Sequence, residues 1–163
     1  MAVGVTAESA GRRHRVCRMA LRQSRNMEKE QLTLESTLQS VDEAETIAMR
    51  EAQKAGFEED DQQQIGMAVR ECMVNAVVHG NRYNKKKKVH LDLEPSTTGL
   101  TVVIGDEGEG FNLESLPDPL SPENLMRQSG RGLLLVRAFM DDFQVQPREG
   151  GGTEVRLKKN LSK

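Results

Sequence analysis

The chain has 163 residues, enough for one domain with a hydrophobic core, and carries a net charge of −2 with 36% hydrophobic and 29% charged residues. No apolar run reaches the roughly 18 residues that a membrane span requires, and 3% aromatic content leaves no stacking platform for single-stranded nucleic acid. Two distant cysteines, Cys17 and Cys72, provide neither a disulfide framework nor a zinc site. We expect a cytoplasmic protein with no membrane and no direct nucleic-acid partner.

The N-terminal segment is strongly basic. Residues 1–26 contain six arginines against one glutamate, with little apolar patterning. They lack the apolar core of a secretory signal, so export is not expected. We predict a disordered tail over residues 1–30. The alternative is a basic arm that contacts nucleic acid or an acidic partner. Ordered patterning begins just after Met27, a candidate for the true start, and we expect one domain over residues 31–160.

The first two predicted elements are a strand and a helix. Leucines alternate with polar residues over Gln31–Leu38, which predicts the strand. Asp42–Ala55 is predicted to be the helix, with Ser40 as its N-terminal cap and Gly56 as its stop.

A long amphipathic helix follows and is the central feature of the sequence. From Asp60 onward its apolar residues recur at three- and four-residue steps, and its acidic first turn suits the positive end of the helix dipole. Gly80 and Asn81 can adopt a left-handed conformation, so we expect them to cap this helix.

The central helix carries three polar residues at four-residue intervals, Glu71, Asn75 and His79. Residues with this spacing lie on one side of an α-helix. We therefore predict a row formed by a carboxylate, an amide and an imidazole.

The second half of the chain is predicted to be rich in hairpins, because alternating apolar residues are separated by glycine and proline clusters. In chain order we expect a lysine-rich solvated turn at Asn84–Lys88, strands at Val89–Glu94 and Leu100–Gly105, a long loop at Phe111–Ser129, a helix at Gly132–Asp141, and strands at Phe143–Gln146 and Thr153–Lys158. A loop of that length is usually functional. The order predicts an α+β fold, a two-layer sandwich whose mixed, largely antiparallel sheet has helices on one face.

A glycine-rich stretch begins where a predicted buried strand ends. Asp106 leaves this strand and is followed by Gly108 and Gly110. An ionised aspartate there can accept a hydrogen bond from the exocyclic amine of adenine. The glycines let the backbone approach a flat ring or a phosphate closely.

Further candidate groups suit a bound nucleotide. The Gly130-Arg131-Gly132 stretch leads into a predicted helix, whose free backbone N–H groups form an anion site. The oxygen of Asn75 suits Mg²⁺, and Glu71 one turn earlier can accept a proton from a hydroxyl that attacks a γ-phosphate. Each feature alone is more typical of an ordinary turn or surface helix, whereas their conjunction indicates nucleotide binding. The P-loop and dinucleotide-fold motifs are absent.

The order of these motifs resembles the GHKL-type ATP-binding domain, the histidine-kinase-like ATPase superfamily of gyrase, chaperone, histidine kinase and mismatch-repair ATPases. The matching residues are Glu71-x-x-x-Asn75-Ala76-x-x-His79-Gly80-Asn81, Asp106-x-Gly108-x-Gly110, Gly130-Arg131-Gly132-Leu133 and Gly152-Thr153. Within the superfamily, the compact length and the first motif resemble bacterial anti-sigma-factor serine/threonine kinases. The resemblance covers about residues 31–160.

The resemblance implies a role for each matched residue. Glu71 would be the general base and Asn75 the Mg²⁺ ligand, while Asp106 would bind the adenine amine in a pocket shaped by Gly108 and Gly110. The loop would close as a lid over the phosphates, with Arg127 as the candidate for the γ-phosphate and Arg131 as its competitor. The other implied nucleotide-binding residues are His79, Gly130, Gly132, Leu133 and Thr153.

By the same resemblance, the chain is expected to be an ATP- and Mg²⁺-dependent protein serine/threonine kinase and anti-sigma factor. It would form a homodimer, sequester a sigma factor and phosphorylate a STAS-type antagonist. The alternative is a non-catalytic ATP-binding module that sequesters a protein partner, and the presence of Glu71 argues against it. The catalytic half of a histidine kinase lacks support, because none of His14, His79 and His90 lies on a separate dimerising helix pair.

Overall fold

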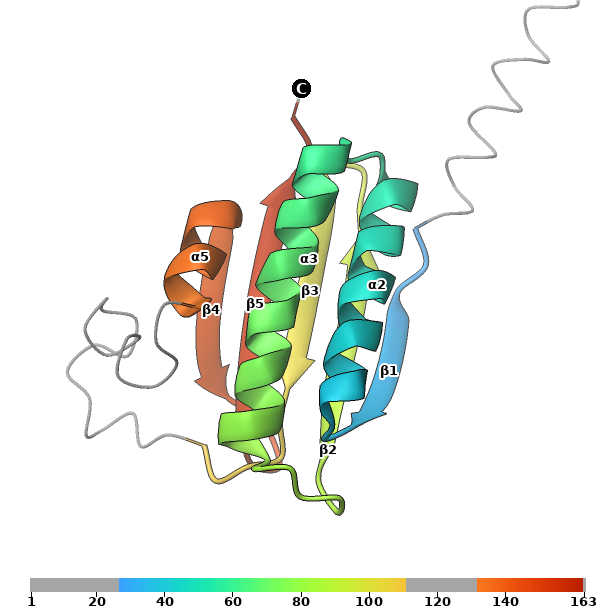
Figure 1. Cartoon of the computed structure of the whole chain (residues 1–163). Coiled ribbons are helices and arrows are strands. Elements are labelled where there is room, and N and C mark those ends of the chain that lie inside the picture. The colour runs from blue at the N-terminus through green and yellow to red at the C-terminus, as the bar shows by residue number, and fades with distance from the viewer. Residues whose placement is uncertain (1–26, 111–131, 163) are drawn as a thin grey trace, which may run out of the picture.

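The computed structural model describes residues 27–110 and 132–162, which form two layers with the helices on one face of a β-sheet (Figure 1). The elements are β1 (Glu30–Glu35), α2 (Leu38–Ala55), α3 (Glu59–Val74), the π-helical segment η2 (Asn75–Gly80), β2 (Lys88–Pro95), β3 (Gly99–Gly105), α5 (Gly132–Phe139), β4 (Asp142–Pro147) and β5 (Thr153–Asn160). The predicted α+β class is confirmed. The predicted N-terminal tail up to residue 26 and the predicted loop at Phe111–Ser129 lie outside the described residues.

The five strands are ordered β1-β2-β3-β5-β4, and all four pairings are antiparallel. The prediction of a mixed sheet is therefore wrong for the described residues. The connection through α5 does join two strands that run in the same direction, β3 and β4, as Figure 1 shows. However, β5 returns between them, so each meets a strand of opposite direction and no parallel pair forms.

The core lies between the sheet and the helices. Alternation along β2 directs Leu91 and Leu93 toward the helices, while the inner stripe of α3 contributes Ile65, Val69 and Met73, all without exposed surface. Burial of each such side chain stabilises the fold by about 1.5–3 kcal/mol. Among the described residues, no helix has the length and apolar character to cross a bilayer.

The boundary between β1 and α2 differs from the prediction. The expected strand, Gln31–Leu38, stops at Glu35, and α2 begins at Leu38. Ser40 is not the cap; the side chain of Thr37 accepts a hydrogen bond from the backbone N–H of Ser40 at 3.2 Å. Leu38 continued the strand-like alternation in the sequence, yet it is 54% exposed on the first helical turn. The capping hydroxyl decided this boundary.

The two long helices end in different ways. Gly56 terminates α2 with a φ of 98°, so its predicted role as a stop is confirmed. The predicted left-handed cap at Gly80 and Asn81 is wrong, because Asn81 is right-handed with a φ of −81°. The left-handed residues are the next two, Arg82 and Tyr83, with φ of 51° and 56°. The reason is that η2 continues α3 with wider turns, so the chain changes direction only in the loop that follows η2.

Candidate nucleotide-binding site

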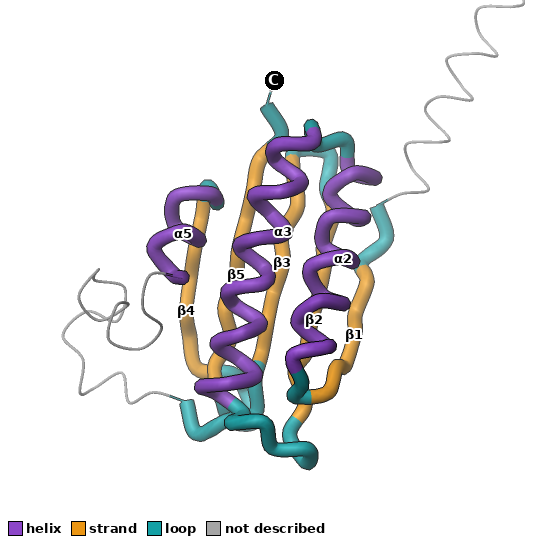
Figure 2. The backbone as a smooth tube through the Cα atoms, in the orientation of Figure 1, coloured by secondary structure: helices purple, strands orange, loops and turns teal. Residues whose placement is uncertain are grey.

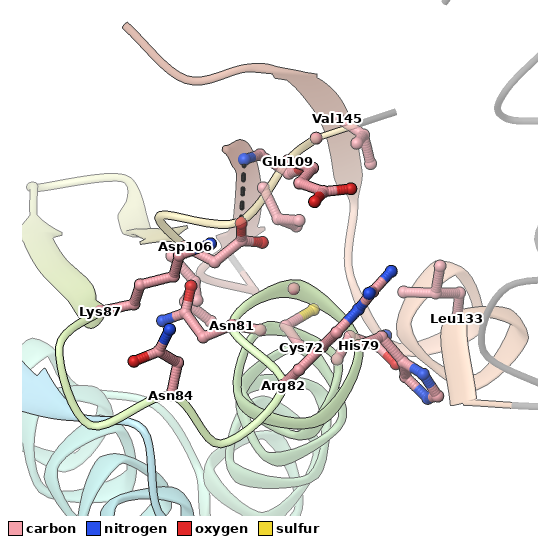
Figure 3. Close-up of a pocket in the computed structure, with 17 residues that line it drawn as sticks. Cys72, His79, Asn81, Arg82, Asn84, Lys87, Asp106, Glu109, Leu133 and Val145 are labelled. Atoms are coloured by element: carbon pink, nitrogen blue, oxygen red, sulfur yellow. Dashed lines mark hydrogen bonds between the residues drawn. The ribbon is translucent and has the colours of Figure 1, made fainter. Parts of the chain in front are cut away.

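The loop after η2 and the turn after β3 lie at the same end of the sheet (Figure 2). A cavity of about 460 Å³ opens there (Figure 3). Its volume falls within the range of small-molecule sites. Its walls come from the end of α3, η2, β3, α5 and the β4–β5 hairpin. The predicted nucleotide-binding residues that line it are Asn75, His79, Asp106, Gly110, Leu133 and Thr153.

Asp106 is the buried charged group of this cavity, with 7% of its surface exposed. Its Oδ1 accepts hydrogen bonds from the backbone N–H groups of Gly108 at 2.9 Å and Thr153 at 3.2 Å. Burial raises the pKa of Asp106 above its ordinary value of 3.8, and this is opposed by those two bonds and by the charges of Arg148 and Lys87. Among the described residues, Oδ2 has no hydrogen-bond partner, so it is the oxygen left to bind a ligand.

Glycines allow backbone segments to converge on Asp106. A Cβ at Gly80 would lie 2.5 Å from the Oδ2 of Asp106, and one at Gly152 would collide with its carbonyl oxygen. A Cβ at Gly108 would collide with the carbonyl oxygen of Gly80. Side chains at these three positions would therefore displace the carboxylate or the turn that holds it. This part of the cavity is therefore shaped by closely packed backbone.

The helix that carries the predicted polar row changes its hydrogen-bond pattern at Asn75. In η2 the backbone N–H of Asn81 donates to the carbonyl of Ala76, five residues earlier, at 2.8 Å. Single π-helical turns inside helices are frequent at functional sites. Asn75 and His79 line the cavity and Glu71 does not, so the predicted row is divided.

Glu71 lies beside the start of α5. A Cβ at Gly132, the first residue of α5, would collide with the Oε2 of Glu71. The carboxylate therefore occupies space that only a glycine at position 132 leaves open. The remaining predicted residues Arg127, Gly130 and Arg131 lie outside the described residues.

Asn81 is a positioning residue whose contacts the sequence analysis missed. Its amide nitrogen donates to the hydroxyl of Ser36 and to the carbonyl of Lys88, each at 2.9 Å, and its oxygen accepts from the backbone N–H of Glu107 at 2.8 Å. With 2% of its surface exposed, this one side chain joins the ends of β1, β2 and β3. Two of the partners are 45 and 26 residues away in the chain, so its position after the predicted helix was the sole signal available.

Two cationic side chains of the cavity were also missed as site residues, Arg82 and Lys87. The lysine-rich turn was predicted to be solvated, and Lys85 and Lys86 are indeed exposed. Lys87 is half-buried and faces the cavity instead. The available signal was that Arg82 directly follows the Asn75–Asn81 motif and that Lys87 lies in the loop after it.

Comparison with known proteins identifies the family. Residues 34–159 match the model of the histidine kinase-like ATPase domain. The chain belongs to this family. The resemblance stated from the motifs is thereby confirmed.

Relatives with similar sequences carry names that refer to anti-sigma activity. An anti-sigma F factor of Bacillus subtilis is 34% identical over 108 residues, which cover 64% of this chain and 73% of the relative. An anti-sigma F factor of Clostridium beijerinckii is 30% identical over 105 residues, covering 63% and 73%. A serine-protein kinase RsbW of Oceanobacillus iheyensis is 29% identical over 105 residues, covering 61% and 66%.

Solved structures of the family share the fold. The structure of the RsbU and RsbW domains of Rv1364c from Mycobacterium tuberculosis matches with a TM-score of 0.57 at 20% identity, covering 83% of this chain and 33% of that longer one. The catalytic domain of the histidine kinase ThkA matches with a TM-score of 0.52 at 17% identity, covering 82% and 98%. Both likenesses confirm the histidine-kinase-like sandwich.

Proposed function

We propose that this chain is an ATP-dependent protein serine/threonine kinase that acts as an anti-sigma factor. Membership of the histidine kinase-like ATPase family and the similarity to relatives named anti-sigma F factor and serine-protein kinase RsbW support this activity. The observation that carries the proposal is the buried carboxylate of Asp106 in a cavity of about 460 Å³.

In the proposed complex, Asp106 recognises adenine. Its Oδ1 is held by two backbone N–H groups, so Oδ2 accepts the hydrogen bond of the exocyclic amine. The apolar side chains of Ile104 and Val155 line the same cavity and suit the faces of a ring. Gly110 and Thr153 complete this end of the site.

The phosphates are assigned to the end of the cavity next to η2 and α5. Asn75 lines it and offers an amide oxygen, which fits Mg²⁺ because this ion takes few protein ligands and shares its sphere with water and phosphate. When bound, Mg²⁺ neutralises charge on the transferred phosphate. On the protein side, His79 and Leu133 border the phosphates. The remaining proposed phosphate ligands are Arg127, Gly130, Arg131 and Gly132.

The proposed reaction is in-line phosphoryl transfer. A serine or threonine hydroxyl of the substrate protein gives its proton to the Glu71 carboxylate as its oxygen attacks the γ-phosphorus. The bond from the γ-phosphorus to the bridging oxygen of ADP breaks, and ADP leaves. Glu71 contacts Gly132 at the start of α5. This contact supports the role of Glu71 as the base, because the start of α5 borders the end of the cavity that is assigned to the phosphates.

The proposal extends to the partners and the cellular setting. A sigma factor is the partner that the names of the relatives support. We further propose a STAS-type antagonist as the phosphate acceptor, a homodimer as the working unit and the cytoplasm as the location.

The test is transfer of γ-labelled phosphate from Mg·ATP into proteins of a lysate of the source organism, with wild type and Glu71→Gln. We expect one small protein to be labelled on serine or threonine by wild type and not by the variant, while both bind ATP. Equal labelling by both would contradict the role of Glu71. Tight ATP binding without any transfer would support the non-catalytic sequestering module instead.

A further inference from the structure

Arg82 is a cationic side chain of the cavity wall for which the motifs assigned no role. It directly follows Asn81, lines the cavity, and extends past His79 toward Leu133 of α5 (Figure 3). Within the described residues, no carboxylate forms an ion pair with Arg82. Its guanidinium is thus available to an anion at the end of the cavity assigned to the phosphates.

The backbone holds Arg82 in an unusual conformation. Its φ of 51° and the φ of 56° at Tyr83 are left-handed, a region that residues other than glycine rarely adopt. Backbone bonds from Tyr83 to the carbonyl of Val77 and from Asn84 to that of Asn81, both 3.0 Å, impose this turn. Strain of this kind clusters at ligand sites, where the surrounding structure maintains it. Here the turn sets the direction in which the Arg82 side chain leaves the backbone.

The charges of the cavity are divided between its two ends. Lys87 lies on the Asp106 side, where its charge favours the ionised carboxylate. Figure 3 shows the Arg82 side chain extending toward Leu133 of α5, apart from Lys87. An ATP molecule that places adenine at Asp106 directs its phosphates to the Arg82 end. A guanidinium matches phosphate oxygens with two parallel N–H donors, which makes arginine well suited to this contact.

We propose that Arg82 binds the polyphosphate of the nucleotide and makes the site select ATP and ADP over adenosine. This inference rests on the proposed function, because it takes ATP as the ligand of the cavity. Arg82 belongs to the wall formed after η2, whereas the arginines implied by the family resemblance belong to the segment before α5. The two groups would therefore approach the phosphates from different parts of the chain.

The experiment is calorimetric titration of wild type, Arg82→Gln and Arg82→Gly with Mg·ATP, Mg·ADP and adenosine. Lys85→Gln is the matched control, because it removes one positive charge from the same loop at an exposed position outside the cavity. We expect both Arg82 variants to bind ATP and ADP about tenfold more weakly or worse, as expected for a lost charge-assisted hydrogen bond. Adenosine affinity should stay at the wild-type value, and Lys85→Gln should resemble wild type with all three ligands.

The Arg82→Gly variant distinguishes the effect of the lost charge from any effect of the left-handed backbone. Glycine accepts the left-handed conformation without strain, so Arg82→Gly should melt at or above the wild-type temperature and still lose ATP affinity. ATP binding within twofold of wild type by both Arg82 variants would overturn the inference. An equal loss of adenosine affinity would also overturn it, since the pocket and not the phosphate contact would have changed. If wild type binds none of the three ligands, the proposed function itself fails.

Discussion

Substitution of Asn81 tests whether one buried amide holds together the end of the sheet that carries the site. In Asn81→Ala, the carbonyl of Lys88 and the N–H of Glu107 lose their partners, at 2.9 Å and 2.8 Å in the wild type. Ser36 keeps its 2.6 Å bond to the carbonyl of Lys87. A backbone group left unpaired costs about 1–3 kcal/mol when it is buried, and both of these groups are partly buried. Two groups at the low end of that range give an expected loss of about 2 kcal/mol, against a typical total stability of about 5–15 kcal/mol.

The assay is urea unfolding without nucleotide, followed by circular dichroism because the chain has no tryptophan. Asn84→Ala is the control, since Asn84 is exposed and its side chain accepts one bond, from the backbone N–H of Lys86 at 2.9 Å. We expect Asn84→Ala to cost less than about 1 kcal/mol, as surface substitutions usually do. Asn81→Ala should also bind ATP more weakly, because the Glu107 N–H bond holds the turn after Asp106. A difference in stability of less than about 1 kcal/mol between the two variants would refute this reasoning.

Two further predictions concern the carboxylates. Asp106→Asn should bind ATP at least about tenfold more weakly, since a donor replaces the acceptor Oδ2. Because burial raises the pKa of Asp106, ionisation of this carboxyl destabilises the folded wild type as the pH rises through the raised value. Urea unfolding should therefore find Asp106→Asn at least as stable as wild type at pH 7. The difference in free energy of unfolding between the two proteins should narrow as the pH falls toward 3.8. Gly132→Ala should reduce phosphoryl transfer about tenfold or more in the labelling assay, because its methyl group would displace the Glu71 carboxylate. ATP affinity should fall less than transfer does, since alanine keeps the backbone N–H that is proposed to bind phosphate. A stability difference that widens toward acidic pH would contradict the expectation for Asp106→Asn. Phosphoryl transfer at the wild-type rate would contradict the expectation for Gly132→Ala.

Local sequence patterns were sufficient for most of the secondary structure. Alternation identified β2 and β3 nearly to the residue, and the glycine at position 56 identified the end of α2. Alternation reflects which side chains are buried, and a glycine reflects a special backbone conformation. Both can therefore be recognised from residues that are close together in the sequence. Where two local signals competed, as at Thr37 and Leu38, the pattern predicted the wrong boundary.

The candidate site was predicted as a set of residue types and not as an arrangement. The spacing of Asp106, Gly108 and Gly110 was visible in the chain, and so was the family resemblance that assigned them to a nucleotide. The sequence did not indicate that Glu71 turns to Gly132 while Asn75 and His79 line the cavity. Helical periodicity also did not predict the change from α3 to η2, on which His79 lies.

The sequence by itself determined the α+β class, the order of its elements and the motifs that place the chain among histidine kinase-like ATPases. Each of these depends on spacing along the chain. The tertiary structure alone decided the antiparallel order β1-β2-β3-β5-β4, the three bonds of Asn81 and the direction of Arg82. These depend on groups that are far apart in sequence and meet when the helices cover the sheet, because burial leaves a polar group stable only where a partner is within hydrogen-bond reach.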